Sequence, residues 1–162
     1  MCNTKSCSGK VYFMKCKLCK KCGFVKYLIG ILIVAVIVIQ FFPVEHTNPP
    51  VTGEIEAPEK VMTILRTSCY DCHSNKTVWP WYSYVAPMSW LVSNDVRDGR
   101  AHLNFSEWAS YSTEKRDHKR EECGEEVEEG EMPLWFYIPL HPEAELSEED
   151  AETILAWSKG EL

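Results

Sequence analysis

One short motif constrains this chain more than any other feature: Cys69-Tyr70-Asp71-Cys72-His73. Two thiols three positions apart, followed at once by an imidazole, form the C-x-x-C-H signature of covalent haem attachment. The thiols can reach the two vinyl groups on one edge of a porphyrin, and the histidine can then bind the iron from below. The motif predicts one covalently bound haem c per chain, with His73 as the proximal iron ligand.

The same cysteine spacing also occurs in zinc sites, in redox-active dithiols and by chance. A zinc site needs a second pair of ligands at similar spacing, and the sequence after residue 44 has only one further cysteine, Cys123. A dithiol of the thioredoxin kind sits at the start of a helix that follows a strand, and no strand is predicted before Cys69. Haem attachment is therefore favoured, with a thiol–disulfide protein kept as an alternative.

The charge of the chain changes abruptly near residue 44. Residues 1–43 contain seven lysines and no acidic residue, whereas the remainder carries ten basic and twenty-four acidic side chains, so a segment of +7 precedes one of −14. At this boundary, Phe24 to Val44 form an apolar run of twenty-one residues broken only by Lys26 and Gln40. A helix of this length spans about 30 Å, the apolar thickness of a bilayer. Residues 24–44 are therefore predicted to be a transmembrane anchor.

The lysines precede the apolar run, so the positive-inside rule keeps residues 1–23 in the cytoplasm and exports the rest. A cleavable signal peptide is the alternative, but the run is long and ends in Gln-Phe-Phe-Pro-Val, without the small residues of a cleavage site. In both cases the Cys69 motif leaves the cytoplasm. We expect a single-pass protein of the inner (cytoplasmic) membrane, with the lipid bilayer as a partner and a periplasmic or extracytoplasmic domain.

Five cysteines lie in the predicted cytoplasmic tail, residues 1–23: Cys2, Cys7, Cys16, Cys19 and Cys22. The last three are spaced as C-x-x-C-x-x-C, but a bacterial ferredoxin run would place a fourth cysteine where the sequence has Lys26. We interpret the tail as a reduced basic segment open to acylation, with metal binding as the alternative. Met14 is a second candidate start of the chain.

Residues 45–56 lack an apolar period and are interpreted as an extended tether, in which His46 is a solvated residue. The exported domain is predicted to cover residues 57–162 and to be all-α, because no stretch alternates apolar and polar residues long enough to form a sheet. Four helices are expected in this domain. The first begins with Pro58, and the second covers Ser89–Asp98 and stops at Gly99. The third covers Thr113–Glu129 and stops at Gly130, and the fourth follows Ser147 as N-cap, with Asp150 completing a capping box.

Two features in and just after the third predicted helix each have a structural and a functional interpretation. Cys123 is interpreted as a small core hydrophobe rather than a reactive thiol. The acidic run Glu121–Glu131 is interpreted as a solvated face, with a negative docking patch for a basic redox partner as the alternative. So acidic a domain argues against nucleic acid as a partner.

Aromatic residues are concentrated in a loop after the motif. Trp79, Trp81 and Tyr82 flank Pro80, and Trp90 follows in the next predicted helix. Rings of this size could cover a porphyrin face or edge and exclude water, and they could equally build a small core. We predict that these four side chains help to bind the cofactor.

The sixth coordination position of the iron has several candidate ligands: Met88, His102, His118, Met132 and His141. Met132 is favoured because Gly130-Glu131-Met132-Pro133 reads as a turn between two helices that could place a thioether over the distal face. His102 and Met88 are the main alternatives, and an open position is another. A thioether ligand would raise the reduction potential above that of bis-histidine ligation.

Taken together, the residues from Ser68 to the C-terminus resemble the bacterial haem-binding domain family, small C-x-x-C-H proteins behind a single N-terminal anchor. The motifs that carry this resemblance are Cys69-Tyr70-Asp71-Cys72-His73-Ser74-Asn75, Trp79-Pro80-Trp81-Tyr82-Ser83-Tyr84, Ala86-Pro87-Met88-Ser89-Trp90, His102-Leu103-Asn104-Phe105-Ser106-Glu107-Trp108, Glu129-Gly130-Glu131-Met132-Pro133 and His141-Pro142. The order of helix, C-x-x-C-H, loops, Met-Pro and C-terminal helix is also similar to class I cytochromes c.

The resemblance implies haem bound covalently at Cys69 and Cys72, with His73 as proximal and Met132 as plausible distal ligand. The expected fold is all-α, with one N-terminal transmembrane helix and a small cytochrome c-like helical haem domain. The expected function is that of a membrane-anchored monohaem c-type cytochrome that passes single electrons between partner proteins. The alternative is a haem-based sensor or small peroxidase-like enzyme with an open distal site.

Overall fold

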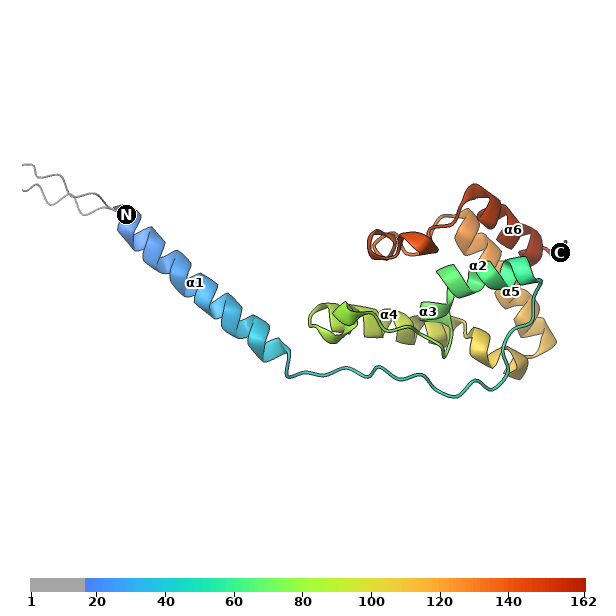
Figure 1. Cartoon of the computed structure of the whole chain (residues 1–162), viewed down its shortest axis with the longest axis horizontal. Helices are drawn as coiled ribbons and strands as arrows, with labels where there is room; N and C mark the ends of the chain where they lie inside the picture. The colour runs from blue at the N-terminus through green and yellow to red at the C-terminus, as the bar shows by residue number, and fades with distance from the viewer. Residues whose placement is uncertain (1–16) are drawn as a thin grey trace, which may run out of the picture. The chain divides into compact units, whose positions relative to one another are not determined.

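The computed structural model describes residues 17–162, which divide into one unit that ends at Phe42 and a second from Pro43 to Leu162. The described residues form α-helices and short 3-10 helices and contain no β-strand, which confirms the predicted all-helical class (Figure 1). Residues 1–16 of the predicted tail, with Cys2, Cys7, Cys16 and the alternative start Met14, lie outside the described residues.

The first unit contains helix α1 (Lys17–Ile39), which covers most of the predicted anchor. The helix ends in a turn in which the amide of Phe42 bonds to the carbonyl of Ile39 at 3.3 Å. Among the residues that the structure describes, no helix is both long and apolar enough to cross a membrane. The membrane-spanning anchor therefore stays a prediction.

The segment predicted as a tether is bound along the second unit. The Arg100 guanidinium donates to the carbonyl of Thr47 and to Oδ1 of Asn48, both at 2.8 Å. Further on, the amide of Ile55 bonds to the carbonyl of Phe105 at 2.9 Å. The tether interpretation is corrected accordingly: backbone groups of residues 47–55 find partners on the domain, so this stretch is part of the fold.

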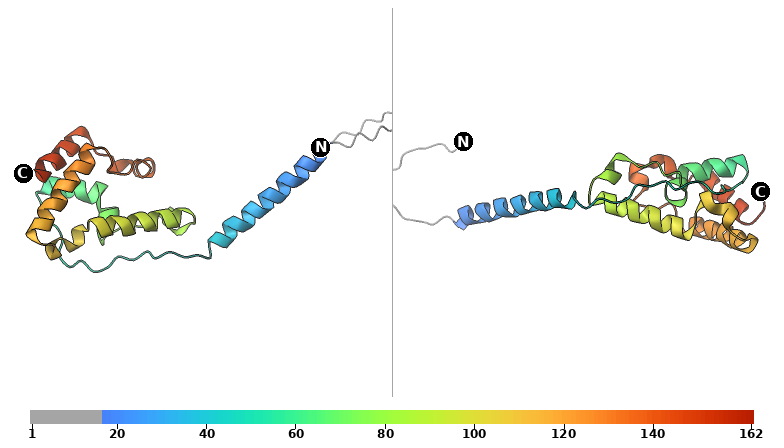
Figure 2. Two further views of the ribbon diagram at one scale, coloured as in Figure 1. Left: turned by 180° about the vertical axis from the view of Figure 1, so that it is seen from behind. Right: turned by 90° about the horizontal axis from the view of Figure 1, so that it is seen from below.

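The core lies between helices α2 (Glu59–Ser68), α5 (Thr113–Glu128) and α6 (Glu148–Ser158). Val61 and Leu65 stand one turn apart on α2 and pack with Phe105, Ile154 and Trp157, all nearly inaccessible to solvent. Helix α6 contacts both α2 and α5 (Figure 1; Figure 2). This packing supports one wall of the site described below.

The helix signals in the sequence are largely confirmed. α2 begins one residue after Pro58, the capping box of Ser147 and Asp150 is formed at the start of α6, and Gly130 adopts φ +74° just beyond α5. The prediction for Gly99 is wrong, because α4 (Met88–His102) continues through it. A Cβ at Gly99 would lie 2.8 Å from the carbonyl oxygen of Cys72, so this glycine serves a close approach between α4 and the motif.

The remaining elements are short and connect these helices. They are α3 (Tyr70–His73), η1 (Trp81–Tyr84), η2 (Phe105–Ser110), η3 (Ile138–Leu140) and η4 (Pro142–Ala144). α3 is a single turn that packs against α4. It contains most of the C-x-x-C-H motif and therefore holds the motif against a longer, rigid helix.

Candidate functional site

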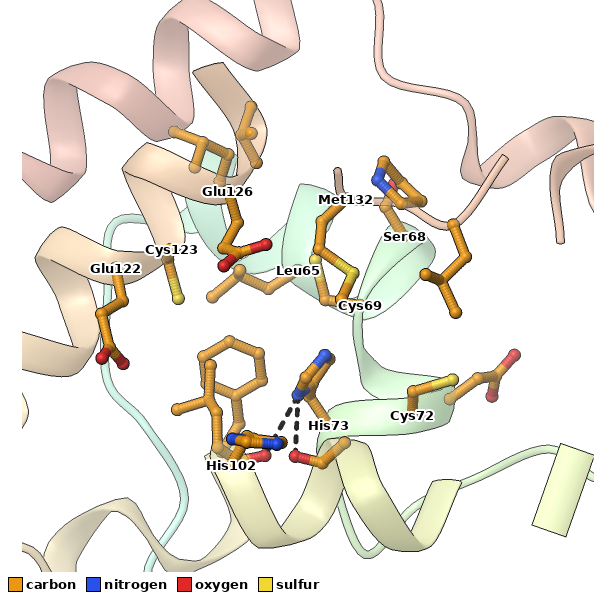
Figure 3. A pocket seen from close by; sticks show the side chains of 18 of the residues that line it. Leu65, Ser68, Cys69, Cys72, His73, His102, Glu122, Cys123, Glu126 and Met132 are labelled. Carbon is orange, nitrogen blue, oxygen red and sulfur yellow. Dashed lines mark hydrogen bonds between the residues drawn. The ribbon is translucent and has the colours of Figure 1, made fainter. Parts of the chain in front are cut away.

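A cavity of about 530 Å³ lies beside the C-x-x-C-H motif in the second unit (Figure 3). Residues of α2, α3, α4, η2, α5, α6 and the loop after α5 line it. Much of the wall is apolar: Leu65, Leu103, Phe105, Val127, Leu134 and Ile154. A cavity of this size and character suits a large, mostly apolar ligand.

The motif itself folds into a tight helical turn. The amide of Cys69 caps α2 with a 3.0 Å bond to the carbonyl of Leu65, and the amide of His73 bonds back to the carbonyl of Cys69 at 2.9 Å. Residues three and four positions apart share a side of such a turn. Cys69, Cys72 and His73 therefore all line the same cavity, as their spacing predicts.

The two motif thiols are free, and both residues are half-buried. Burial raises the pKa of the Cys69 thiol to about 12 and that of the Cys72 thiol to about 12. A thiol must ionise before it attacks a disulfide, and redox-active cysteines have lowered pKa values for this reason. The environment of the pair therefore argues against the thiol–disulfide alternative.

The imidazole of His73 is held in one orientation. Its Nδ1 lies 3.0 Å from the carbonyl oxygen of Gly99 and 3.2 Å from that of Leu103, so Nδ1–H donates to the end of α4 (Figure 3). Burial lowers the pKa of His73, which keeps the ring neutral. Nε2 then carries the lone pair, and no other described residue bonds to it. A ring oriented through Nδ1 in this way is typical of a histidine that binds a metal through Nε2.

Met132 reaches the cavity from the turn that ends α5. Gly130, with its positive φ, reverses the chain, and the amides of Glu131 and Met132 bond to the carbonyl of Glu126 at 3.0 and 3.1 Å. Figure 3 shows the side chains of Met132 and His73 pointing toward one another from opposite sides of the cavity. The sulfur and the imidazole could therefore bind the two faces of one planar ligand.

The other candidate ligands are distributed unevenly. His102 also lines the cavity, although its side chain is exposed at the end of α4. Met88 lines a second, smaller cavity of about 40 Å³. Nε2 of His118 lies 3.1 Å from Oε1 of Glu122 within α5, and Nε2 of His141 is bonded to the hydroxyl of Tyr82. Of the five candidates, the structure brings Met132 and His102 to the main cavity.

The predicted aromatic ligands of the cofactor do not line the main cavity. Trp79 packs edge-on against His46, and Trp81 is 78% exposed. Trp90 lies outside both cavities, whereas Tyr82 lines the smaller one. The two cavities are neighbours, because the motif residue Cys72 lines both. Of these four residues, only Tyr82 therefore lines a cavity that the motif also lines.

Tyr137 is a site residue that the sequence did not reveal. It lines both cavities, and its hydroxyl donates to Oδ2 of Asp71 at 2.8 Å. Burial raises the pKa of Tyr137, so the phenol stays protonated as the donor. Its ring also stacks on His141 with centroids 4.1 Å apart. The only available signal was its position in the loop that follows Met132.

Helix α5 contributes a polar wall to the cavity. Glu122, Glu126 and Cys123 line it (Figure 3). Lys119 pairs with Glu122. Part of the acidic run therefore faces the site rather than forming only a solvated surface. Burial raises the pKa of the Cys123 thiol to about 12, in keeping with its predicted role as a small packing residue.

The donor atoms fit an iron porphyrin better than a bare ion. Within the described part of the chain, no group of three or more His, Cys, Asp or Glu side chains could hold a metal ion. The cavity offers instead one imidazole and one thioether on opposite sides and two adjacent thiols. Two axial donors suffice for an iron whose other four positions are filled by a macrocycle.

The chain matches a known protein family. A family model described as a haem-binding domain matches residues 34–160, well over half of the chain. No curated protein and no solved structure matches the chain.

Proposed function

The chain belongs to the haem-binding domain family, and we propose that it is a membrane-anchored monohaem c-type cytochrome that carries single electrons. In this proposal Cys69 and Cys72 bind the haem covalently, His73 is the proximal iron ligand and Met132 the distal ligand. The observation that carries the proposal is the facing arrangement of His73 and Met132 across a cavity that both motif thiols also line.

Covalent attachment uses the two thiols as they stand in the structure. Each thiol adds across one vinyl group, so that a C–S bond forms, the vinyl double bond is lost and the thiol hydrogen ends on the neighbouring carbon. The addition needs no oxidant and requires the thiols to be reduced. Cys69 and Cys72 are free thiols on the wall of the cavity, as this reaction requires.

The two axial ligands of the iron would come from the two sides of the cavity. The bonds from Nδ1 to the carbonyls of Gly99 and Leu103 hold the His73 ring so that Nε2 is left to bind iron. The turn after Gly130 holds Met132 on the other side. When bound, the haem iron supplies one-electron chemistry, and thioether ligation favours a higher reduction potential than a second imidazole would.

The anchoring and location of the protein form a further part of the proposal. Apolar side chains along α1 are exposed within this helix: Ile31 is 66% exposed and Leu32 is 63% exposed. Such side chains are stabilised by a hydrocarbon environment, and the lysines that precede them favour a cytoplasmic N-terminus. We propose that the bilayer of the inner membrane holds this segment and that the second unit, with its excess of acidic residues, meets an unidentified redox partner outside the cytoplasm.

The alternative function as a haem sensor or small peroxidase-like enzyme requires an open or displaceable distal position. His102 and Glu126 line the cavity and could serve such chemistry. With Met132 bound to the iron, however, an external ligand has no free position to occupy. Binding of carbon monoxide to the reduced protein therefore separates the two functions.

The test uses the full chain produced in a host that matures c-type cytochromes. We expect haem to remain attached after denaturation, a peptide containing Cys69 and Cys72 to carry its added mass, and the reduced protein to be low-spin and inert to carbon monoxide. A double variant with Cys69→Ala and Cys72→Ala is the control for attachment. A colourless chain without added mass would overturn covalent binding, and rapid carbon monoxide binding would favour the sensor or enzyme.

A further inference from the structure

The main cavity contains one basic side chain that the proposed function leaves without a role, Lys119 of α5. Among the described residues that line this cavity, no other lysine or arginine occurs. The Lys119 side chain is only 18% exposed, and lysine is seldom covered by protein unless it is paired. Its ammonium group has three donors, and Oε2 of Glu122 accepts one of them at 2.5 Å. Lys119 therefore has donors left for a negatively charged group of a ligand.

The ammonium group lies at the end of the cavity away from the motif residue Cys72. Figure 3 shows Glu122 and Cys72 at opposite ends of the cavity, with His73 between them. Because Nζ of Lys119 is 2.5 Å from the Glu122 carboxylate, it lies at the Glu122 end as well. The cavity therefore has a thiol at one end and an ammonium group at the other, with the proposed proximal ligand between.

A haem has two chemically different halves that match this arrangement. Two vinyl groups project from one half of the porphyrin, and two propionate carboxylates project from the opposite half. Once Cys69 and Cys72 hold the vinyl half, the propionate half points toward α5. A carboxylate that leaves water is costly unless a cation or hydrogen-bond donors meet it. The site therefore needs a cation at the α5 end.

We propose that Lys119 binds one haem propionate through a charge-assisted hydrogen bond from its Nζ. This inference rests on the covalent attachment in the proposed function, because attachment sets the direction of the porphyrin. Hydrogen bonds between ionised groups are shorter and stronger than those between neutral groups. The contact would hold the half of the ring that the thioether bonds leave free.

The acidic residues of the same wall make this lysine more important. Glu122 and Glu126 both line the cavity, and a propionate beside them would be repelled without a cation. Glu122 also has a second neighbour, because Nε2 of His118 lies 3.1 Å from its Oε1. The Glu122 carboxylate therefore keeps a partner when Lys119 shares its donors with the propionate.

The contact would also act on the iron. Reduction adds a negative charge to the site, so a positive charge close to the ring favours the reduced iron. Lys119 would therefore raise the reduction potential, in the same direction as thioether ligation by Met132.

The test measures the contact directly in the haem-loaded full chain. The haem carries ¹³C only at its two propionate carboxyls, and the lysines carry ¹⁵N at Nζ. Rotational-echo double-resonance NMR then detects carboxyl carbons that lie next to an Nζ. We expect one of the two carboxyl signals to be attenuated in the parent protein. Lys119→Arg keeps the charge and removes the label, so the attenuation should disappear.

Lys115→Arg is the matched control, one turn earlier on α5. Nζ of Lys115 lies 4.0 Å from the centroid of the Tyr111 ring, and this residue does not line the cavity. The attenuation should therefore persist in Lys115→Arg. Redox titration gives a second readout: Lys119→Gln should lower the reduction potential, Lys119→Arg should stay close to the parent, and Lys115→Gln should match it.

The outcomes separate this inference from the proposed function. A parent protein without covalently bound haem would overturn both. Covalent, low-spin haem with neither carboxyl signal attenuated would overturn the Lys119 contact alone. Attenuation that persisted in Lys119→Arg would assign the contact to another lysine and would also overturn it. The comparison of the parent with Lys119→Arg decides the matter even where Lys119→Gln does not fold.

Discussion

Tyr137 donates a 2.8 Å hydrogen bond from its hydroxyl to Oδ2 of Asp71, and the bond joins the two sides of the cavity. Asp71 lies between the two motif cysteines, and Tyr137 lies in the loop that carries Met132. Oδ1 of the same carboxylate accepts the amide of Val78 at 2.8 Å. This carboxylate therefore fixes the segment of the proximal ligand to the loop of the proposed distal ligand.

Replacing the tyrosine tests this connection. Tyr137→Phe removes the donor and leaves the ring, so the Met132 loop should open more often. We expect carbon monoxide to bind the reduced variant measurably faster, and the free energy of unfolding to fall by about 1.5–3 kcal/mol, as for a lost hydrogen bond to a charged group. Stopped-flow mixing and denaturant titration measure the two effects.

Tyr84→Phe is the matched control for this variant, because the Tyr84 hydroxyl is exposed and no described residue bonds to it. It should behave like the parent protein in both measurements. If Tyr137→Phe also did so, the bond to Asp71 would have no part in holding the loop.

Met132→Ala should convert the reduced iron from six-coordinate to five-coordinate. The thioether is lost, alanine cannot reach the metal, and the variant should become high-spin, bind carbon monoxide and have a lower reduction potential. Absorption and magnetic circular dichroism spectra with a redox titration measure this. Met88→Ala, outside the main cavity, is the control. An unchanged low-spin spectrum in Met132→Ala would assign the distal position to another residue, with His102 as the next candidate.

Gly99→Ala should disturb the proximal side. The added Cβ would lie 2.8 Å from the carbonyl oxygen and 3.2 Å from the Cβ of Cys72, so α4 must move away from the motif. The carbonyl of Gly99 would then be displaced from Nδ1 of His73. We expect a loss of about 1–3 kcal/mol of stability, typical of overpacking, and a lower yield of attached haem, measured by denaturant titration and by haem content per chain.

Gly30→Ala is the control for this substitution, because a Cβ at Gly30 meets nothing within 4 Å. Full haem content and unchanged stability in Gly99→Ala would show that α4 does not need its close approach to Cys72.

Acid should weaken the domain partly through Glu54. A hydrogen bond from Lys76, with its Nζ 2.7 Å from Oε1 of Glu54, lowers the pKa of this carboxyl below its usual 4.5 in the folded protein. Between the two pKa values the unfolded chain binds more protons, so stability from this group is complete above pH 4.5 and is lost as the pH falls through the folded value. Because the pair is partly exposed, we expect at most about 1 kcal/mol.

Glu54→Gln checks this assignment. The difference in stability between parent and variant, measured by urea titration, should be present at neutral pH and shrink below pH 4.5. A difference that stayed constant as the carboxyl became protonated would contradict the pKa argument.

The local parts of the site could be predicted from the sequence. Two thiols and an imidazole at positions 69, 72 and 73 share one side of a single turn, because backbone hydrogen bonds between near neighbours determine their directions. The capping box at Ser147 and the positive φ of Gly130 follow from short-range preferences in the same way. These features need no information from distant parts of the chain.

Contacts between distant segments were decided by the tertiary structure. The sequence listed Met132 among five candidate ligands, and helix packing placed it opposite His73 while leaving Met88 at another cavity. The bond from Tyr137 to Asp71 and the attachment of His46 to Ser83 span 66 and 37 positions. Hydrophobic periodicity shows which face of a helix is buried, but partners depend on how the helices pack together, and that is a property of the whole fold.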